Sequence, residues 1–392
     1  MMSTRRGFMR GMFAVVAAAS LPMMRAHTSP AQAAAPDATT RATVITAPAS
    51  QTGTWEHLGP AQPVKRLFTP TSGALLASTG SALLRSDDAG TSWREVPLPV
   101  DSGVHSMEVD PNDHRVVYAA SAAGVHRTDD EGASWSSVLP STLSTLRIAV
   151  SSANDQILYV AQAGGGSSGS TGGAFAFRRS LDRGATWETL EETTQGPCSW
   201  AVLILQPHPT DPTRLFRTQG CYAGRNLGDI IEQSRDNAAS FTTLFSAQTA
   251  FPQAIVGGGG VEPGRLYLSL NNDFRSGGSR IVASGDDGTT WTPILEYTGG
   301  GTMSGATVPS TIISGLAYDP AAPERVFVAQ ERKMITQQPV EASGVASTVD
   351  GGLTWAEIGQ QDLPHINQLA LGIDGLNLFA ATEAGVWRLP LG

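Results

Sequence analysis

The chain has 392 residues, of which 41% are apolar and 16% charged, with 43 Gly and 24 Pro. This apolar content supports a packed core and excludes a disordered chain, and the Gly and Pro favour short strands and tight turns over long helices. The formal net charge is −9, and the first 33 residues hold four Arg and no acid, so the rest is more acidic still. An acidic surface repels phosphate backbones, which makes nucleic acid an unsuitable partner. No apolar run reaches the ~18 residues of a membrane-spanning helix.

Residues 1–33 have the three parts of a signal peptide. The pair Arg5-Arg6 precedes Phe8-Met9-Arg10, an apolar run extends to Met24, and Ala31-Gln32-Ala33 matches a small-residue cleavage site. We expect a twin-arginine export signal, with an ordinary secretory signal that contains two arginines by chance as the alternative. Residues 34–53, rich in Pro, Ala and Thr, are expected to form a linker. The protein is therefore predicted to be exported to a periplasmic or extracellular compartment.

An eight-residue pattern, [ST]-x-D-x-G-x-[ST]-W, recurs along the rest of the chain. Five complete copies occupy residues 86–93, 128–135, 180–187, 284–291 and 348–355. A degenerate copy at 234–241 has Ala in place of Gly and Phe in place of Trp. The aspartates of the six octapeptides are Asp88, Asp130, Asp182, Asp236, Asp286 and Asp350. Such repetition indicates a repeat architecture.

Each position of the octapeptide has a structural explanation. The Asp carboxylate accepts N–H groups of its own turn, Gly supplies the positive φ of a tight hairpin, and Trp begins the next strand with a large buried face. Calcium binding is the alternative, but the octapeptide lacks the regularly spaced Asp and Asn ligands of a calcium-binding loop. We predict a structural role for the six aspartates and expect no metal and no cofactor.

The segments around each octapeptide predict four short antiparallel strands. In the clearest unit, an apolar first strand at 106–109 leads through an Asp-Pro turn to a second strand at 116–119. A third strand at 124–127 then enters the octapeptide, and a fourth leaves from its Trp. The unit returns at intervals of roughly 50 residues, which is typical of the blades of a β-propeller.

Seven blades are predicted. Trp55 has no strands before it, and the strand at 385–388 has none after it, so residues 54–59 are expected to supply the last strand of a blade begun by residues 363–390. This arrangement closes the ring and removes free sheet edges. The predicted fold is all-β: a seven-bladed β-propeller with octapeptide hairpins, spanning residues 54–391 as one domain.

The octapeptides resemble the Asp-box, or BNR, repeats of a propeller group that includes sialidases, sortilin-type receptors, xyloglucan-cleaving glycosidases and photosystem II assembly factors. The resemblance covers residues 54–391 and is specific for the fold rather than the function. Seven blades, single-domain length and Gly-Val-x-Arg third strands are most similar to photosystem II assembly-factor-like proteins and BNR-repeat proteins of unknown function. This resemblance implies an exported binding scaffold that is not an enzyme. The Arg-Ile-Pro signature of sialidases is matched only weakly, by the segment Arg66-Leu67-Phe68-Thr69-Pro70.

The two cysteines, Cys198 and Cys221, flank a predicted hairpin that turns at residues 208–212. Because they are symmetrical about that turn, we expect them to lie opposite each other and to form a disulfide in an oxidising compartment. Two buried free thiols are the alternative.

The long insertions of the repeat all fall on one predicted face of the ring, opposite the octapeptide turns, and we interpret this face as the working face. Candidate binding residues in or beside these loops are Tyr222, Arg225, Asn271, Asp273, Arg275, Tyr297, Glu331 and Arg332. Three of them, Arg225, Arg275 and Arg332, come from consecutive blades and are candidates for an anion clamp. Solvated surface arginines are the alternative.

No catalytic set of residues is apparent. The seven His have no metal-ligand spacing, and nothing in the spacing of Asp273, Glu296 and Glu331 selects a carboxylate pair for glycoside cleavage. We predict a monomeric, non-enzymatic scaffold that binds a protein or carbohydrate on the long-loop face. A sialidase-like or β-glucan-cleaving glycoside hydrolase is the alternative.

Overall fold

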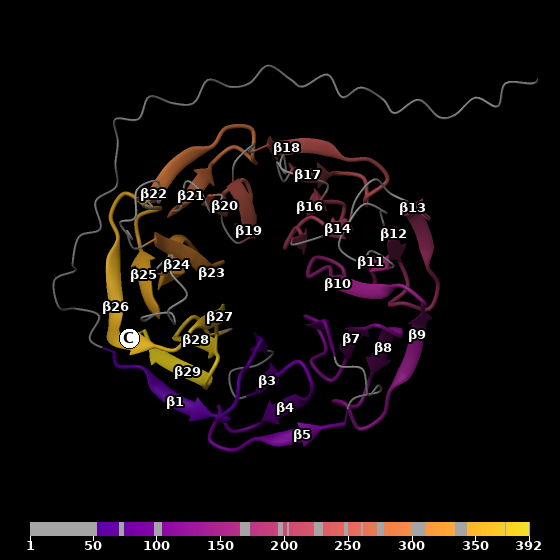
Figure 1. Cartoon of the computed structure of the whole chain (residues 1–392), viewed down its shortest axis with the longest axis horizontal. Coiled ribbons are helices and arrows are strands. Elements are labelled where there is room, and N and C mark those ends of the chain that lie inside the picture. The colour runs from indigo at the N-terminus through magenta and orange to yellow at the C-terminus, as the bar shows by residue number, and fades with distance from the viewer. Residues whose placement is uncertain are drawn as a thin grey trace, which may run out of the picture. The chain divides into compact units, whose positions relative to one another are not determined.

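The computed structural model describes residues 53–69, 74–97, 104–164, 173–194, 199–201, 204–222, 230–246, 250–259, 262–272, 278–298, 310–333, 343–372 and 374–391. All regular elements in these ranges are β-strands, and they form seven sheets arranged as a ring (Figure 1). In this part of the chain no helix is long and apolar enough to cross a membrane. The predicted all-β, seven-bladed propeller is confirmed. The predicted signal peptide lies outside the described residues, as does the linker apart from Gly53.

The sheets are numbered as blades in chain order. Blade 1 contains β2 (Arg66–Phe68), β3 (Leu75–Ser78), β4 (Leu83–Ser86) and β5 (Arg94–Val96). Blade 2 contains β6 (Ser106–Val109), β7 (Val117–Ser121), β8 (Gly124–Thr128) and β9 (Ser136–Pro140). Blade 3 contains β10 (Ser144–Val150), β11 (Leu158–Gly164), β12 (Ala174–Ser180) and β13 (Glu188–Thr193).

Blade 4 has its first strand in two pieces, both paired with the second strand. It contains β14 (Ser199–Ala201), β15 (Leu205–Pro207), β16 (Leu215–Tyr222), β17 (Ile230–Ser234) and β18 (Thr242–Ser246). Blade 5 contains β19 (Ala250–Gly257), β20 (Leu266–Asn272), β21 (Gly278–Ser284) and β22 (Thr292–Thr298). Blade 6 contains β23 (Ser310–Asp319), β24 (Ala322–Lys333), β25 (Ser343–Thr348) and β26 (Ala356–Leu363).

Blade 7 joins the two ends of the described chain. Its strands are β27 (Ile366–Leu371), β28 (Asn377–Thr382), β29 (Gly385–Pro390) and, as the fourth, β1 (Glu56–Gly59). In the antiparallel β1–β29 pair, His57 lies opposite Trp387, and their ring centroids are 4.8 Å apart. The blade split between the ends of the chain is as predicted.

The apolar core of the described chain is divided into seven clusters, one at each interface between neighbouring blades. The second strands explain this division, because successive side chains of a strand point to opposite faces. On β7, Val117 and Ala119 pack toward blade 1, whereas Tyr118 and Ala120 pack toward blade 3. A second strand is therefore buried on both faces, which accounts for its continuous apolar sequence.

The octapeptides all form the same turn between a third and a fourth strand. In the first, Asp88 Oδ1 accepts hydrogen bonds from Ser86 Oγ and Ser92 N, each at 2.8 Å, and Oδ2 accepts one from Ser92 Oγ at 2.6 Å. The same three bonds recur at Asp130, Asp182, Asp236, Asp286 and Asp350. The hydroxyl bond to Ser92 is the largest of the contacts that lower the pKa of Asp88 to about 2.

The Gly and Trp of the octapeptide contact the preceding blade. Gly132 has a φ of +91°, and a Cβ added there would lie 1.9 Å from Cγ1 of Val96 in blade 1. The indole N–H of Trp135 donates to the carbonyl of Pro97 at 2.7 Å. Among the octapeptide tryptophans only Trp355 is buried, and the other four are half-buried. At these four positions less of the Trp ring is buried than we predicted, because the ring lies beside the outermost strand of its blade.

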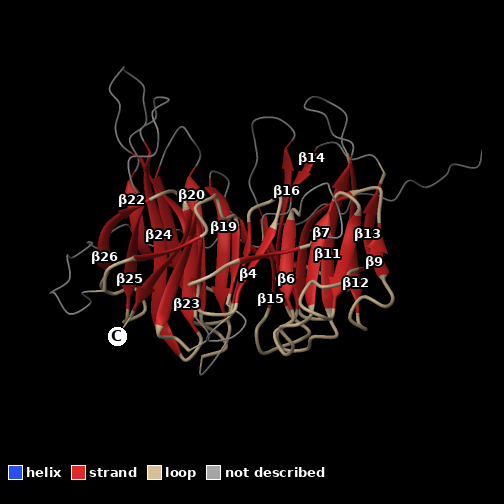
Figure 2. Ribbon diagram, turned by 90° about the horizontal axis from the view of Figure 1, so that it is seen from below, coloured by secondary structure: helices blue, strands red, loops and turns tan. Residues whose placement is uncertain are grey.

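The strand order defines two faces of the ring. The octapeptide turns and the hairpins between first and second strands lie on one face, which we call the Asp-box face. The connections between second and third strands and between blades lie on the other, which we call the loop face. Figure 2 shows the described turns of the Asp-box face along the lower edge of the ring.

Candidate functional site

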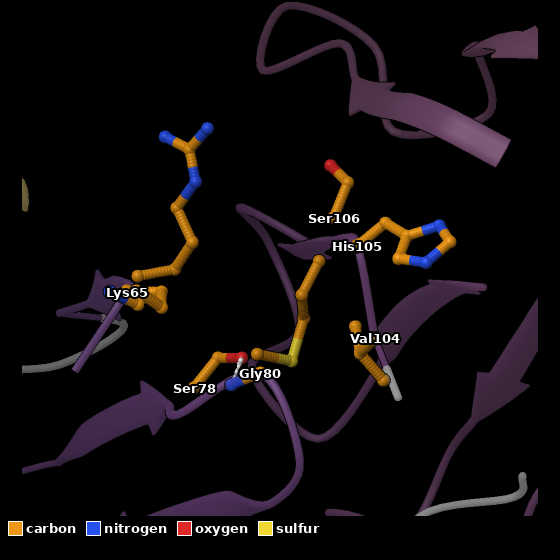
Figure 3. A pocket seen from close by; sticks show the side chains of 8 residues that line it. Lys65, Ser78, Gly80, Val104, His105 and Ser106 are labelled. Carbon is orange, nitrogen blue, oxygen red and sulfur yellow. Dashed lines mark hydrogen bonds between the residues drawn. The ribbon is translucent and has the colours of Figure 1, made fainter. Parts of the chain in front are cut away.

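A cavity of about 140 Å³ lies at the loop-face end of blades 1 and 2 (Figure 3). The starts of β2 and β6 and the connection between β3 and β4 form its walls. Its lining residues are Lys65, Arg66, Ser78, Gly80, Val104, His105, Ser106 and Met107. The cavity is therefore built mainly from strand ends, which the clusters between the blades hold in place.

Basic side chains surround this cavity. Lys65 and His105 are exposed and Arg66 is half-buried. Lys65 Nζ forms an ion pair with Glu383 of blade 7 at 2.5 Å, and His105 Nδ1 lies 3.1 Å from Ser144 Oγ of blade 3. Basic groups at the mouth of a cavity favour an anionic ligand, above all a carboxylate.

Three charged residues, Arg66, Glu108 and Arg147, lie on the innermost strands of blades 1 to 3, and we call them the inner charge cluster. Strand β6 packs against both β2 and β10, and Ile148 N donates to Ser106 Oγ at 3.3 Å. Glu108 is half-buried, and this burial raises its pKa to about 7, although Arg66 and Arg147 act in the opposite direction. Burial also lowers the pKa of Arg147 to about 10, and repulsion from Arg66 adds to this effect.

The inner charge cluster was not among the sites predicted from the sequence. The available signal was a charged residue inside a short, otherwise apolar first strand, as in Arg66-Leu67-Phe68 and Ser106-Met107-Glu108-Val109. Burying a charged residue without a partner has a high cost in free energy. The partners belong to neighbouring blades, so no local pattern identifies them.

Two of the predicted binding residues contact neighbouring strands or blades. The amide of Asn271 on β20 clamps the backbone of Ile313 on β23, with Nδ2 donating to the carbonyl at 3.1 Å and Oδ1 accepting from N–H at 3.2 Å. The hydroxyl of Tyr297 on β22 donates to Gln330 Oε1 in blade 6 at 2.5 Å, and burial raises the pKa of Tyr297. Both residues connect blade 5 to blade 6.

Glu331, on the second strand of blade 6, is fully buried. Its carboxylate forms an ion pair with Nδ1 of His365, whose side chain is 31% exposed. A ligand on the loop face would therefore meet the imidazole of His365 rather than the carboxylate. Glu296, the other described member of the predicted acid set, is exposed on β22, the outermost strand of blade 5.

The other predicted binding residues cannot be placed in the site. Arg225, Asp273 and Arg275 lie outside the described residues, and so do the side chains of Tyr222 and Arg332. The predicted clamp of Arg225, Arg275 and Arg332 thus stays a prediction. Within the described residues no group of three or more His, Cys, Asp or Glu is placed to hold a metal ion.

The disulfide also stays a prediction, because Cys198 lies outside the described residues. The register of β14 and β16 places Cys221 opposite Trp200, two positions beyond Cys198. The direct opposition expected from the symmetry of the hairpin is therefore wrong. Pairing of Pro207 with Leu215 centres the hairpin on Asp211, and the register shifts between β15 and β14.

Comparisons with known proteins support the resemblance to Asp-box propellers. A family model described as Sortilin, neurotensin receptor 3 (Sortilin-Vps10) matches residues 81–250. No protein with a curated description matches this sequence. The resemblance predicted from the octapeptides is confirmed by this match together with the seven-bladed fold.

Several solved structures share the fold. The GH74 xyloglucanase from Xanthomonas campestris aligns with a TM-score of 0.61 and 18% identity, covering 86% of this chain and 53% of that chain. The GH74 enzyme from Niastella koreensis has a TM-score of 0.60, with the same identity and coverage. The present chain thus spans about half the length of these two enzymes. The structure of YCF48 bound to D1 peptide aligns with a TM-score of 0.57 and 14% identity, covering 89% of this chain and 98% of that chain. At such identities the similarity shows the fold alone.

Proposed function

We propose that this protein is an exported, non-enzymatic binding or assembly scaffold that holds a protein or glycan partner on its loop face. The observation that carries this proposal is the basic cavity between blades 1 and 2. The chain as a whole has a net charge of −9, so a cavity lined by Lys65, Arg66 and His105 is a local reversal of charge. Such a site favours a partner that offers a carboxylate, either an acidic peptide or a uronic-acid glycan.

The construction of the cavity fits a binding role. Met107 in its wall belongs to the apolar cluster between blades 1 and 2, and the backbone N–H of Gly80 is held by Ser78 Oγ at 3.3 Å (Figure 3). A site on fixed strand ends loses little conformational freedom when a ligand binds. Among the fold neighbours, YCF48 is seen with a bound peptide, which supports a peptide as one kind of partner.

The alternative function is glycoside hydrolysis, which the fold similarity to two GH74 enzymes favours. That chemistry needs two carboxyl groups on either side of the scissile bond. Two described carboxylates near the loop face are engaged in other contacts. Glu331 is buried against His365, and Glu383 accepts bonds from Lys65 at 2.5 Å and from Asn367 at 3.0 Å. The scaffold function therefore has the stronger support.

Arrays of acidic, neutral and basic peptides, and of neutral and uronic-acid glycans, test the scaffold function. We expect retention on carboxylate-bearing ligands that is lost in the double variant Lys65→Gln/Arg66→Gln. The control is Arg115→Gln, which removes a charge from the exposed hairpin of the Asp-box face. Retention that is the same in both variants would contradict the proposed site. Turnover of xyloglucan or a sialoside that a loop-face substitution abolishes would favour the hydrolase.

Export is tested separately. Replacing Arg5 and Arg6 by Lys should hold the protein in the cytoplasm if the pair is a twin-arginine signal. The control is Arg25→Lys, which makes the same chemical change beyond the apolar run. Export that survives the double replacement would favour the ordinary secretory signal.

A further inference from the structure

Exposed apolar side chains gather on the Asp-box face of blades 6 and 7. In the described part of the chain five large apolar side chains are exposed, and three of them lie in neighbouring turns of these two blades: Val349 (61%), Leu353 (82%) and Leu376 (57%). The other two, Leu181 and Ile230, stand apart in blades 3 and 4. Single exposed leucines are common on protein surfaces, whereas a group of apolar side chains marks an interaction site. We call Val349, Leu353 and Leu376 the apolar patch.

The start of β24 connects the two turns that carry the patch. In the middle of the blade 6 octapeptide, the N–H of Gly351 donates to the carbonyl of Glu324 at 3.0 Å. The next residue, Arg325, reaches blade 7, where its Nη1 donates to the carbonyl of Gly375 at 3.4 Å. Leu376 directly follows Gly375. The three apolar side chains therefore belong to one stretch of surface that crosses from blade 6 to blade 7.

The linker that precedes the propeller leaves the ring beside this patch. Strand β29 ends on the Asp-box face, where the N–H of Leu391 donates to the carbonyl of Leu376 at 2.8 Å. Gly53, the first described residue, lies against the same strand end, since a Cβ added to it would be 2.6 Å from the carbonyl oxygen of Pro390. Figure 2 marks the C-terminal end of the chain at this edge of the ring. The chain before Gly53 therefore begins at the border of the apolar patch.

The amino-acid sequence of the linker contains one segment suited to the patch. Val44 and Ile45 are the only large apolar residues in 34–52, and they lie in a run of four β-branched residues, 43–46. Such a run favours an extended backbone. The eight peptide units between Ile45 and Gly53 span up to about 26 Å when extended. The segment is therefore long enough to reach every part of the patch from the point where the linker leaves the ring.

Size and charge favour this segment over a second copy of the chain. Three aliphatic side chains cover far less than the ~800 Å² per partner that a stable dimer buries. The exposed Asp374, whose Oδ1 accepts the N–H of Leu376 at 2.9 Å, and the half-buried Glu324 border the patch. Arg41 is the only basic residue of the linker, and it precedes the apolar run by two residues. The linker thus offers both an apolar segment and a charge of the complementary sign.

We propose that residues 43–47 of the linker bind the apolar patch in extended form through Val44 and Ile45. Burial of apolar surface provides the free energy of binding, and the short tether makes the encounter intramolecular at a high effective concentration. The linker is then held on the Asp-box face, and the loop face stays open to a partner. The inference is independent of the proposed function, because no residue of the loop face takes part in it.

Site-specific photo-crosslinking of the full chain tests the proposal. With p-benzoylphenylalanine in place of Ile45, irradiation should produce a crosslink within one chain to a peptide from the turns of the patch, identified by mass spectrometry. The double variant Leu353→Asp/Leu376→Asp should lose this crosslink. The matched control is Leu181→Asp, which makes the same change at a 53% exposed leucine in the octapeptide of blade 3 and should keep the crosslink.

The reverse experiment does not depend on the folding of a patch variant. With p-benzoylphenylalanine in place of Leu353, the crosslink should form to a peptide that contains residues 43–47, and Val44→Asp should abolish it while leaving the propeller itself unchanged. The inference is overturned if the crosslinks join two chains, because a second copy would then cover the patch. It is also overturned if no crosslink forms between the linker and the patch, or if Val44→Asp and Leu353→Asp/Leu376→Asp have no more effect than Leu181→Asp.

Discussion

Replacing Gly132 by Ala should destabilise the propeller strongly, because the new methyl group has two costs. The backbone has a φ of +91°, which costs an L-residue about 1–2 kcal/mol. The Cβ would also lie 1.9 Å from Cγ1 of Val96, which is 1% exposed and β-branched, so it cannot swing away. Overpacking of this kind costs about 1–3 kcal/mol. Together the two costs lower the free energy of unfolding by about 2–5 kcal/mol.

Gly184→Ala is the matched control. Gly184 has nearly the same backbone, with a φ of +87°, but its nearest neighbour, Leu158 Cδ1, would lie 3.4 Å from the added Cβ. Only the backbone cost of about 1–2 kcal/mol should remain. In the degenerate octapeptide at 234–241, Ala238 takes the place of this Gly and is buried at a φ of 67°. A methyl group therefore fits this position where the preceding blade leaves room for it.

Equilibrium urea unfolding of both variants checks this prediction, with the midpoint and its slope compared with the wild type. We expect Gly132→Ala to be less stable than Gly184→Ala by about 1–3 kcal/mol. Equal losses in the two variants would show that contact with the preceding blade does not determine the need for Gly, and the packing argument would be refuted.

Further predictions concern charge. Between about pH 4.5 and 7 the stability of the wild type should fall relative to Glu108→Gln as pH rises, because the raised pKa of Glu108 makes its ionisation in the folded state unfavourable; parallel stability curves from urea unfolding would contradict this. Arg217, 4% exposed, pairs with Glu191 at 2.7 Å and with Glu232 at 2.8 Å, so Arg217→Met should cost about 3–5 kcal/mol, and replacing both acids by Gln in that variant should restore part of the loss. Asp350→Ala removes three hydrogen bonds of its turn and should cost about 1–2 kcal/mol, whereas Val349→Ala, at a 61% exposed position of the same turn, should cost little in the same assay.

The architecture of the propeller could be predicted from the amino-acid sequence, because its determinants are local. All the hydrogen bonds of Asp88 that define a turn lie within eight consecutive residues, so every copy of the pattern predicts a hairpin without knowledge of the rest of the chain. The unmatched strands at residues 54–59 and 385–388 then indicate closure of the ring. The alternating burial of β7 requires only the two-residue period of a strand.

Contacts between blades determine which loop-face residues line a cavity and which stabilise the scaffold, and these contacts could not be predicted from the sequence. Asn271 looked like a binding residue in the sequence, yet its amide clamps the backbone of the next blade. Arg66, Glu108 and Arg147 lie on the first strands of three neighbouring blades, and the two arginines oppose the rise that burial causes in the pKa of Glu108. The physical reason is that blades contact each other side by side, at separations set by the closed ring. Charged residues on neighbouring blades are separated in the sequence by most of a blade, so no short-range sequence pattern predicts that they lie close together.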